Sequence, residues 1–346
     1  MQFFMGKNLF ITLLFLPLCT LAQIGGNGSY HFLNQPSSPR ATALGGILIT
    51  LPDGNVDHAL MNPAQVLQAA DNKLSTSFIN HLADINAGNV TYGKHFDEIG
   101  TFFGGVHYIN YGDFEETLSN GDNTGRTFSA NDVNFYTGIS VPYKKIQVGA
   151  TVKGFYSAYD NFFSSGLAMD FGSTYSDSSG RFTAGLVAKN AGFVINKYNS
   201  SNSEDLPLEI QLGFSQKLEN APFRFTVLLH NLQQFDLTYI DNDPRGKQID
   251  LVTGEPIVEE ISTLDKAFRH VNLGTEAIFS ESFQIRVGYN HLKRKELTIE
   301  DRMSTVGFSW GFGIRVSKFL INYGNAKYHL AGSSHQFGIS LNLNEI

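Results

Sequence analysis

The last third of the chain alternates apolar residues with small or polar ones. Between Val306 and Val316 every second residue is apolar, and the residues between them are glycine, serine or arginine. Successive side chains of a β-strand point to opposite faces, so this pattern predicts a strand with one apolar face and one polar or small face. The same alternation occurs at 283–290, at 146–153 and at 337–344.

Segments of this kind recur along the chain and predict fourteen strands. Most exceed the five or six residues that are usual in soluble proteins, whereas a tilted strand needs about nine to eleven residues to cross a membrane. The predicted strands are 74–82, 86–96, 98–111, 131–141, 144–157, 163–176, 180–190, 207–217, 222–235, 266–280, 282–294, 304–317, 318–328 and 334–344.

The connections between these segments fall into two classes of length. Tight turns are predicted around Asp97, Pro142-Tyr143, 177–179, 219–222, Ser280-Glu281 and Lys318, and long loops at 112–130, 191–206 and 236–265. Short turns at one end and long loops at the other are typical of an up-and-down barrel in a bacterial outer membrane. The sequence therefore predicts an all-β fold, a 14-stranded antiparallel transmembrane β-barrel.

The polar face of the strands must then line the lumen, because a charge on the lipid face costs about 2–4 kcal/mol at the bilayer midplane. The charged residues that the alternation assigns to the lumen are Lys153, Asp170, Glu276, Arg286 and Arg315. The aromatic residues that it assigns to the lipid face are Tyr289, Trp310, Phe312 and Phe337.

Composition agrees with this class of protein. Of the 346 residues 13% are aromatic and only 16% are charged, against a usual charged share of about a quarter. Behind the N-terminus, no run reaches the roughly 18 apolar residues of a membrane helix. The net charge of −7 argues against a nucleic-acid partner.

The N-terminus has the features of a cleaved secretory signal. Lys7 precedes the apolar run 9–18, and Thr20-Leu21-Ala22 places small residues before a cleavage point after Ala22. Cleavage there removes Cys19, the only cysteine, so the mature protein is expected to have no disulfide. A lipoprotein signal around Cys19 is the alternative, but the bulky Leu18 before it fits that interpretation poorly.

A block without strand pattern separates the signal from the first strand. A barrel of fourteen strands is wider than the eight-stranded barrels that side chains alone fill, so we expect residues 23–73 to plug the lumen. The motif residues of this plug are Gly45 and Gly46, which permit tight turns, and Asn62, Pro63 and Ala64, which turn the chain toward the first strand. The predicted organisation is a signal peptide at 1–22, a plug at 23–73 and a barrel at 74–346.

The motif Arg40-Ala41-x-Ala43-Leu44-Gly45-Gly46, followed by Asn62-Pro63-Ala64, resembles the N-terminal region of FadL-like outer-membrane barrels. More closely, the chain resembles the PorV/PorQ family of the type IX secretion system of Bacteroidota, and within it the PorQ group. The other segments that carry this resemblance are 30–33, 127–132, 288–297 and 328–335. Asn-Pro-Ala alone is shared with fatty-acid transporters, so the combination is the more specific signal.

The resemblance implies a non-enzymatic, cell-surface role in the outer membrane of a Gram-negative bacterium. Family members of this kind anchor a PorZ-like surface protein of the complex that, with PorU-like and PorV-like components, joins secreted cargo to lipopolysaccharide. The alternative is a FadL-type importer of hydrophobic small molecules. Bound lipid or detergent in the purified barrel would favour import, and co-purification of a surface protein would favour anchoring.

Two polar segments are candidate contact sites. The acidic loop 236–265 carries isolated apolar residues that could anchor a partner, and its candidate docking residues are Asp241, Asp243, Ile257, Val258, Glu259 and Glu260. A basic patch at the outer end of a strand could contact lipopolysaccharide phosphates, and its residues are His291, Lys293, Arg294 and Lys295. The plain alternatives are a solvated loop tip and an ordinary barrel rim.

The sequence predicts no catalytic residues, metal ligands or cofactor. A rim hydrolase built from Ser309, His291 and Asn290 is conceivable, but their contact does not follow from the sequence. The stretch 241–246 faintly resembles a calcium loop but lacks the glutamate that should close it. The histidines do not have the spacing of a metal site.

Overall fold

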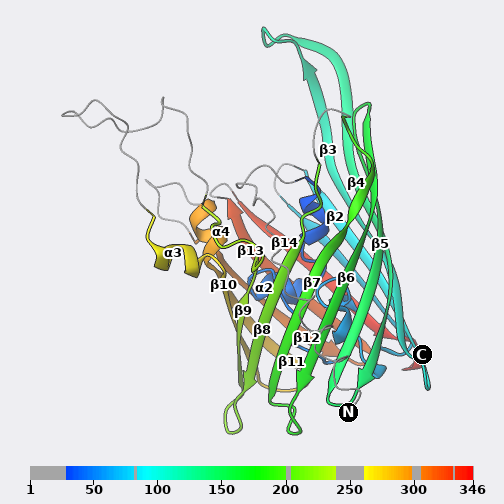
Figure 1. The fold of residues 1–346 in the computed structure, drawn as a ribbon, viewed down its shortest axis with the longest axis vertical. Helices are drawn as coiled ribbons and strands as arrows, with labels where there is room; N and C mark the ends of the chain where they lie inside the picture. The colour runs from blue at the N-terminus through cyan, green and yellow to red at the C-terminus, as the bar shows by residue number, and fades with distance from the viewer. Residues whose placement is uncertain are drawn as a thin grey trace, which may run out of the picture.

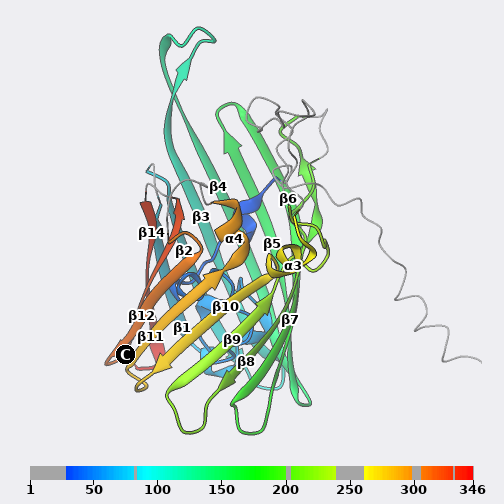
Figure 2. The same ribbon diagram turned by 90° about the vertical axis from the view of Figure 1, so that its left-hand side faces the viewer.

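The computed structural model describes residues 29–81, 84–199, 204–238, 261–297, 305–329 and 332–345. Fourteen antiparallel strands form one closed barrel, in which β1 completes the ring by pairing with β14 (Figure 1; Figure 2). The strands are β1 Lys73–Asn80, β2 Asn86–Phe96, β3 Gly100–Thr117, β4 Asn123–Tyr143, β5 Ile146–Tyr159, β6 Phe162–Ser176, β7 Phe182–Asn196, β8 Glu209–Lys217, β9 Phe223–Leu229, β10 Val271–Ile278, β11 Phe283–Asn290, β12 Phe308–Val316, β13 Phe319–His329 and β14 Gly332–Asn342. The predicted fold class is confirmed.

The period-two pattern places large apolar side chains on the outside of the wall and polar ones inside. Phe135 and Trp310, for example, are 59% and 50% exposed, whereas Lys153 and Glu276 are fully buried in the lumen. Asp170 and Arg286 are also buried, and Arg315 is exposed near the turn end of its strand. An apolar exterior over a polar interior is the arrangement of a membrane barrel.

The long loop predicted at 112–130 is wrong, because most of these residues continue β3 and β4. Beyond Asn110, β3 no longer pairs with β2, but it still pairs with β4 through Phe114 and Phe128. Their rings stack with centroids 5.4 Å apart. At about 3.3 Å per residue, β3 rises roughly 23 Å past its last pair with β2, and this hairpin projects at the top of Figure 1.

Two predicted strand ends are helices instead. The segment 266–280 becomes a strand only at Val271, because α3 occupies Thr263–Phe268. The segment 282–294 ends as a strand at Asn290, where α4 (His291–Glu296) begins. The side chains of Ser262 and Asn290 each accept a hydrogen bond from the backbone three residues ahead, and such N-caps favour helix over continued strand.

Two other strand ends also differ from the predicted ones. β7 continues through Asn196 into the predicted loop 191–206, and β9 ends at Leu229 rather than at residue 235. The segregation of connections is incomplete, because β5 and β6 are joined by only two residues at the end where the longer connections lie. At that end the longer connections are 197–208, 230–270 and 291–307.

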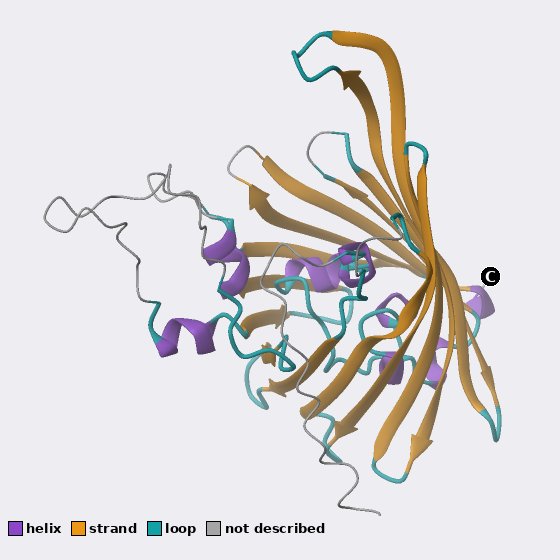
Figure 3. Cartoon of the chain, turned by 45° about the horizontal axis from the view of Figure 1, so that its top comes forward, coloured by secondary structure: helices purple, strands orange, loops and turns teal. Residues whose placement is uncertain are grey.

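Residues 30–70, which we call the inner segment, lie inside the ring of strands (Figure 3). Their short helices are η2 His31–Asn34, α2 Pro39–Ala43, η3 Val56–His58, η4 Pro63–Gln65 and η5 Gln68–Ala70. Helix α2 packs on β11 to β14, whereas η4 packs on β4 to β6, so the segment crosses the lumen from one wall to the other. A short turn of helix, η7 (Leu343–Glu345), follows β14.

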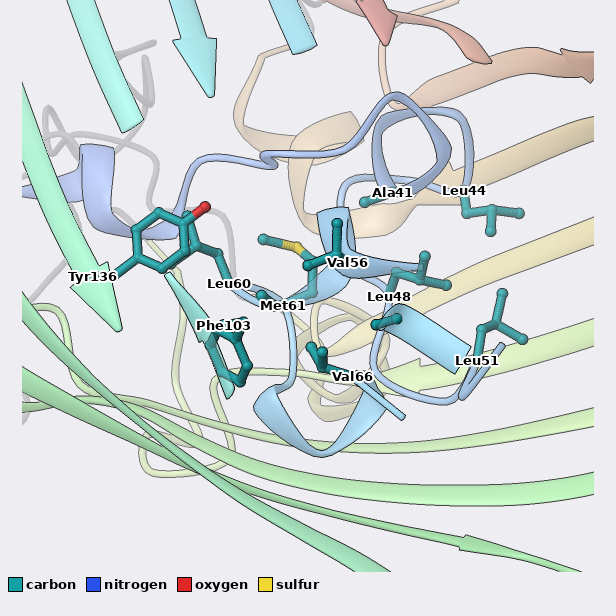
Figure 4. Packing of buried hydrophobic residues seen from close by; sticks show 12 residues of the cluster. Ala41, Leu44, Leu48, Leu51, Val56, Leu60, Met61, Val66, Phe103 and Tyr136 are labelled. Atoms are coloured by element: carbon teal, nitrogen blue, oxygen red, sulfur yellow. The ribbon is translucent and has the colours of Figure 1, made fainter. Parts of the chain in front are cut away.

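The apolar core belongs mainly to the inner segment. A cluster that includes Leu44, Leu48, Val56 and Met61 meets two ring side chains of the wall, Phe103 and Tyr136 (Figure 4). A second cluster joins Tyr30, Phe32 and Leu33 to wall residues that include Ile79 and Phe155. Among the described residues, none of the helices has the length and apolarity that crossing a membrane requires.

Candidate functional site: the filled lumen and its outer mouth

The inner segment touches the wall at glycines. A Cβ on Gly172 would lie 2.0 Å from Asn62 Oδ1, and one on Gly288 would lie 2.3 Å from the backbone nitrogen of Gly45. Real Cβ atoms essentially never approach other heavy atoms this closely. Inward-facing glycines in the strands therefore mark where a second layer of chain lies on the wall, a signal that the sequence contains but that apolar–polar alternation alone does not reveal.

The Asn62-Pro63-Ala64 motif folds as a capped turn. Asn62 Oδ1 accepts a hydrogen bond from Ala64 N at 3.0 Å, and Asn62 Nδ2 donates one to Ile49 O at 2.9 Å. Pro63 opens η4, where its missing N–H is no loss. The motif thus ties together two stretches of the inner segment.

The pair Gly45-Gly46 turns the chain at the end of α2. Both residues have φ near the left-handed region, at +95° and +98°, where glycine is preferred. Asn290 Nδ2 donates a hydrogen bond to Gly45 O at 3.3 Å, which fixes this turn against β11. The two glycines therefore serve both a local turn and a close approach to the wall.

An ion-pair group centred on the buried Glu276, which we call the closed cluster, binds the inner segment to the turn half of the barrel. It consists of Arg40, Asp53, Arg224, Glu276 and Arg286. Glu276 accepts from Arg40 Nε at 2.8 Å, from Arg286 Nε at 3.0 Å and from Arg224 Nη1 at 2.9 Å. Arg40 also pairs with Asp53, so the inner segment supplies both a cation and an anion.

A second buried pair stays within the wall. Lys153 Nζ lies 2.5 Å from an Asp170 carboxylate oxygen and donates to Asn190 Oδ1 at 2.9 Å. Asn190 also donates its backbone N–H to Asp170 Oδ1 at 2.8 Å. These contacts join β5, β6 and β7 and give Lys153 two partners, the carboxylate of Asp170 and the side chain of Asn190.

Two cavities open in the half of the lumen near the longer connections, and both are lined in part by His31, Asn34 and Pro36. One has a volume of 450 Å³, and its mainly apolar lining includes Phe32, Ile85 and Ile109. The other has a volume of 910 Å³, and its lining combines apolar residues with charged ones such as Lys189 and Glu209. Lys293 of α4 borders both cavities.

The predicted docking residues fall outside the part of the chain that the structure describes. Asp241, Asp243, Ile257, Val258, Glu259 and Glu260 belong to the gap between 238 and 261. The two described ends of that loop are joined, because Lys266 Nζ lies 2.6 Å from an Asp236 carboxylate oxygen. Their role as a docking site stays a prediction.

The basic patch lies on α4, and two of its cations contact Asp265, a residue that the sequence pattern does not connect with the patch. The Asp265 carboxylate lies 3.3 Å from His291 Nε2, 3.0 Å from Lys295 Nζ and 3.0 Å from Arg269 Nε. Burial alone would raise the pKa of Asp265, but these neighbours lower it to about 2. Arg294 donates to Val306 O at 3.4 Å.

The residues of the conceivable rim hydrolase have other partners. Residues 307–311 read Gly-x-Ser-x-Gly, the pattern of a nucleophile elbow, although no catalytic residue was predicted. Ser309, however, is buried within β12 and donates its hydroxyl to Ala43 O at 2.9 Å, whereas a nucleophile elbow needs an exposed serine at a strand-to-helix turn. Within the described ranges, no group of three or more His, Cys, Asp or Glu residues is arranged to hold a metal ion.

The chain is similar to solved barrel structures over most of its length. The TodX monoaromatic hydrocarbon channel, in a deltaS2 mutant, is 12% identical over 89% of this chain and 98% of its own, with a TM-score of 0.51. The toluene transporter TodX of P. putida is 10% identical over 90% and 99%, with a TM-score of 0.50. A FadL homologue from Pseudomonas aeruginosa scores 0.47 at 10% identity, over 88% of this chain and 98% of that one.

At such low identities the likeness concerns the fold. The chain has the fold of FadL-like outer-membrane barrels, with all fourteen strands in one closed sheet. No protein-family model matches the sequence, and no curated protein matches it.

Proposed function

We propose that this chain is a non-enzymatic outer-membrane component of a type IX secretion system, as its resemblance to the PorV/PorQ family implies. It is exported by a signal peptide at 1–22 and holds a PorZ-like surface protein next to PorU-like and PorV-like components. The observation that carries this proposal is that the inner segment crosses the lumen and is tied to the wall by the closed cluster. A barrel filled in this way suits an anchor better than a conduit.

The energetics of the closed cluster support a permanent plug. Removing one partner from a buried ion pair costs about 3–5 kcal/mol, because the remaining charge stays buried without compensation. Withdrawal of the inner segment would take Arg40 from the fully buried Glu276, but Glu276 would keep Arg224 and Arg286, so the cost lies below that of a wholly uncompensated charge. The segment 23–73 is therefore proposed to stay in place while the outer loops act.

The outer end offers the surfaces on which a partner and lipopolysaccharide would rest. The acidic loop with Asp241, Asp243, Glu259 and Glu260 remains our proposed docking site, with Ile257 and Val258 as anchors. A few apolar anchors usually dominate an interface, and the charges around them steer approach. The proposed contacts for lipopolysaccharide phosphates are Arg294 and Lys295, of which Lys295 also pairs with Asp265, whereas Lys293 of the predicted patch borders the two lumen cavities.

The test is the location of the PorZ-like protein in cells with altered barrels. Deleting the barrel should release this protein from the cell surface into the medium, as measured by immunoblots of both fractions. Replacing residues 241–260 by a Gly-Asn turn should do the same while the barrel still assembles, because the wall hydrogen bonds lie elsewhere. Shortening the β3–β4 hairpin tip is the matched control and should retain the partner. Full retention without the barrel would overturn the anchor.

Import of hydrophobic small molecules is the second candidate, and the apolar cavity favours it. Its 450 Å³ would accept a small hydrocarbon, and the similar barrels of known structure include a toluene transporter. Toluene binding to the purified barrel, followed by calorimetry, tests this alternative. Replacing Ile109 in the cavity wall by Lys should abolish binding, whereas the outward-facing Ile339→Lys should not.

A further inference from the structure

Four polar side chains form a contiguous group on the inner wall, which we call the open cluster. Lys189 on β7 is paired in register with Glu209 on β8, and Gln211 follows on the same face of β8. His230 follows β9 next to Gln211, as the β8–β9 register continues. All four are buried, with exposed fractions of 2%, 6%, 3% and 3% in that order.

The open cluster has almost no partners among the residues that the structure describes. Across the residues that the structure describes, no hydrogen bond or ion pair engages Lys189 Nζ, the Glu209 carboxylate or the Gln211 side-chain amide. His230 Nδ1 contacts Asn231 Nδ2 at 3.0 Å, but His230 Nε2 has no hydrogen-bond partner. Although Lys189 and Glu209 are neighbours across two strands, their charged groups do not form an ion pair within 4.0 Å.

Of these unpartnered atoms only His230 Nε2 is fully enclosed, whereas the end groups of Lys189, Glu209 and Gln211 keep access to the cavity. Buried polar groups are nearly always hydrogen-bonded, and buried charges are paired, because desolvation without compensation is costly. Lys153, on the same wall, follows this rule through Asp170 and Asn190. The open cluster therefore has the donors and acceptors of a recognition site whose complement comes from another molecule.

The cavity beside the open cluster has the size and lining of a ligand site. All four residues border the 910 Å³ cavity, together with apolar side chains that include Ile47, Met61, Leu206, Leu208 and Leu292. Small-molecule sites usually measure about 300–1,000 Å³ and combine an apolar lining with a few polar groups that fix orientation. A molecule with a polar head and an apolar body matches this division.

The charges on the open cluster define the head. An anion satisfies Lys189 but leaves Glu209 without a partner, and a cation does the reverse. We propose that the open cluster binds a zwitterionic phosphoethanolamine group, with its phosphate at Lys189 and its ammonium at Glu209. Gln211 and His230 supply further hydrogen bonds, and the apolar side chains accept an acyl chain where the ligand carries one.

Phosphoethanolamine can come from a lipid head group or from a free small molecule, and titration calorimetry with the purified full-length barrel separates these sources. The probes are lysophosphatidylethanolamine, lysophosphatidylglycerol and free phosphoethanolamine. We expect the first to bind at least about tenfold more tightly than the second, which lacks the ammonium. Binding of free phosphoethanolamine at similar strength would identify the small molecule as the ligand, and much weaker binding would identify the lipid.

Variants connect the binding to the open cluster. Lys189→Met and Glu209→Gln should each weaken lysophosphatidylethanolamine binding about tenfold or more, whereas Lys145→Met on the β4–β5 turn should not change it. The double swap Lys189→Glu with Glu209→Lys keeps both charges and should retain the preference for the zwitterion. Heat-modifiable migration in gels checks that each variant is folded.

The opposite results would overturn the site. Equal affinity for lysophosphatidylethanolamine and lysophosphatidylglycerol would remove the role of Glu209, and unchanged binding by folded Lys189→Met would remove the site itself. If both single variants misfold, the double swap decides: a folded swap that no longer prefers the zwitterion contradicts the proposal. These outcomes are independent of whether the barrel anchors a surface protein.

Discussion

The closed and open clusters lie in one lumen and are built from similar side chains, yet they differ in whether their charged groups are paired within the protein. In the closed cluster Glu276 has three arginine partners, and Arg40 is shared with Asp53. In the open cluster a lysine and a glutamate stand side by side on neighbouring strands without an ion pair. Glu276, at the centre of the closed cluster, and the four residues of the open cluster are all buried, so burial does not explain the difference.

The inner segment explains it. At the closed cluster this segment contributes Arg40 and Asp53, which complete a network that the wall begins with Arg224, Glu276 and Arg286. At the open cluster the segment borders the cavity with residues among which there is no Asp, Glu, Lys or Arg, namely His31, Asn34, Pro36, Gly46, Ile47 and Met61. The inner segment thus pairs the charges of the wall at the closed cluster and leaves those of the open cluster accessible. The first is a point of attachment for the segment, and the second is a candidate binding site.

The largest expected effect comes from forcing the inner segment off the wall. In Gly172→Val a Cβ would lie 2.0 Å from Asn62 Oδ1, so the segment must move while the β6 backbone can keep its pairs. We expect the purified barrel to change from closed to conducting in planar bilayers. Gly154→Val is the matched control, because its nearest contact would be 3.7 Å. A closed Gly172→Val barrel would show that the inner segment does not block the lumen.

Loss of the closed cluster should loosen the segment without a steric clash. Arg40→Met removes one of the three arginine partners of Glu276 and the partner of the partly exposed Asp53, so its cost stays below the about 3–5 kcal/mol of an uncompensated buried charge. Labelling of Ile49→Cys, a fully buried position, should then be about tenfold faster or more. Arg181→Met breaks an exposed pair with Glu219 and should change the labelling rate little. Equal rates in both variants would contradict a role for the closed cluster in retention.

The sequence predicts the wall better than its contents. Period-two alternation identifies all fourteen strands and the inward side of Lys153, Asp170, Glu276 and Arg286, because the sidedness of a strand is a local property. It misses α4, because Asn290 as an N-cap competes with an apolar pattern that continues past it. It also misses the projecting hairpin, whose strands pair only with each other beyond the barrel.

The sequence could not predict which charged residues of the lumen have partners, because this depends on which part of the inner segment faces each wall residue. Alternation places Glu276 and Glu209 inside in the same way. That Glu276 meets Arg40, some 236 positions away along the chain, whereas Glu209 meets only a cavity, is a long-range result of packing. The inward glycines at 172 and 288 are the part of this information that the sequence does carry.

The smallest effect concerns Asp265. Like Glu276, this carboxylate has its partners within the protein, but its contacts lie near the surface between α3 and α4. Because its partners lower the pKa of Asp265 to about 2, below the roughly 3.9 of an unfolded aspartate, the carboxylate stabilises the fold above pH 4. This stabilisation is lost as the pH falls from about 4 to about 2. Partly exposed ion pairs contribute about 1 kcal/mol or less to stability. The amide hydrogens of α4 should therefore exchange with solvent up to about fivefold faster at about pH 2 than at about pH 4, after correction for the pH dependence of intrinsic exchange. Asp265→Asn should exchange fast at both pH values, and an unchanged pH response in that variant would assign the effect to another group.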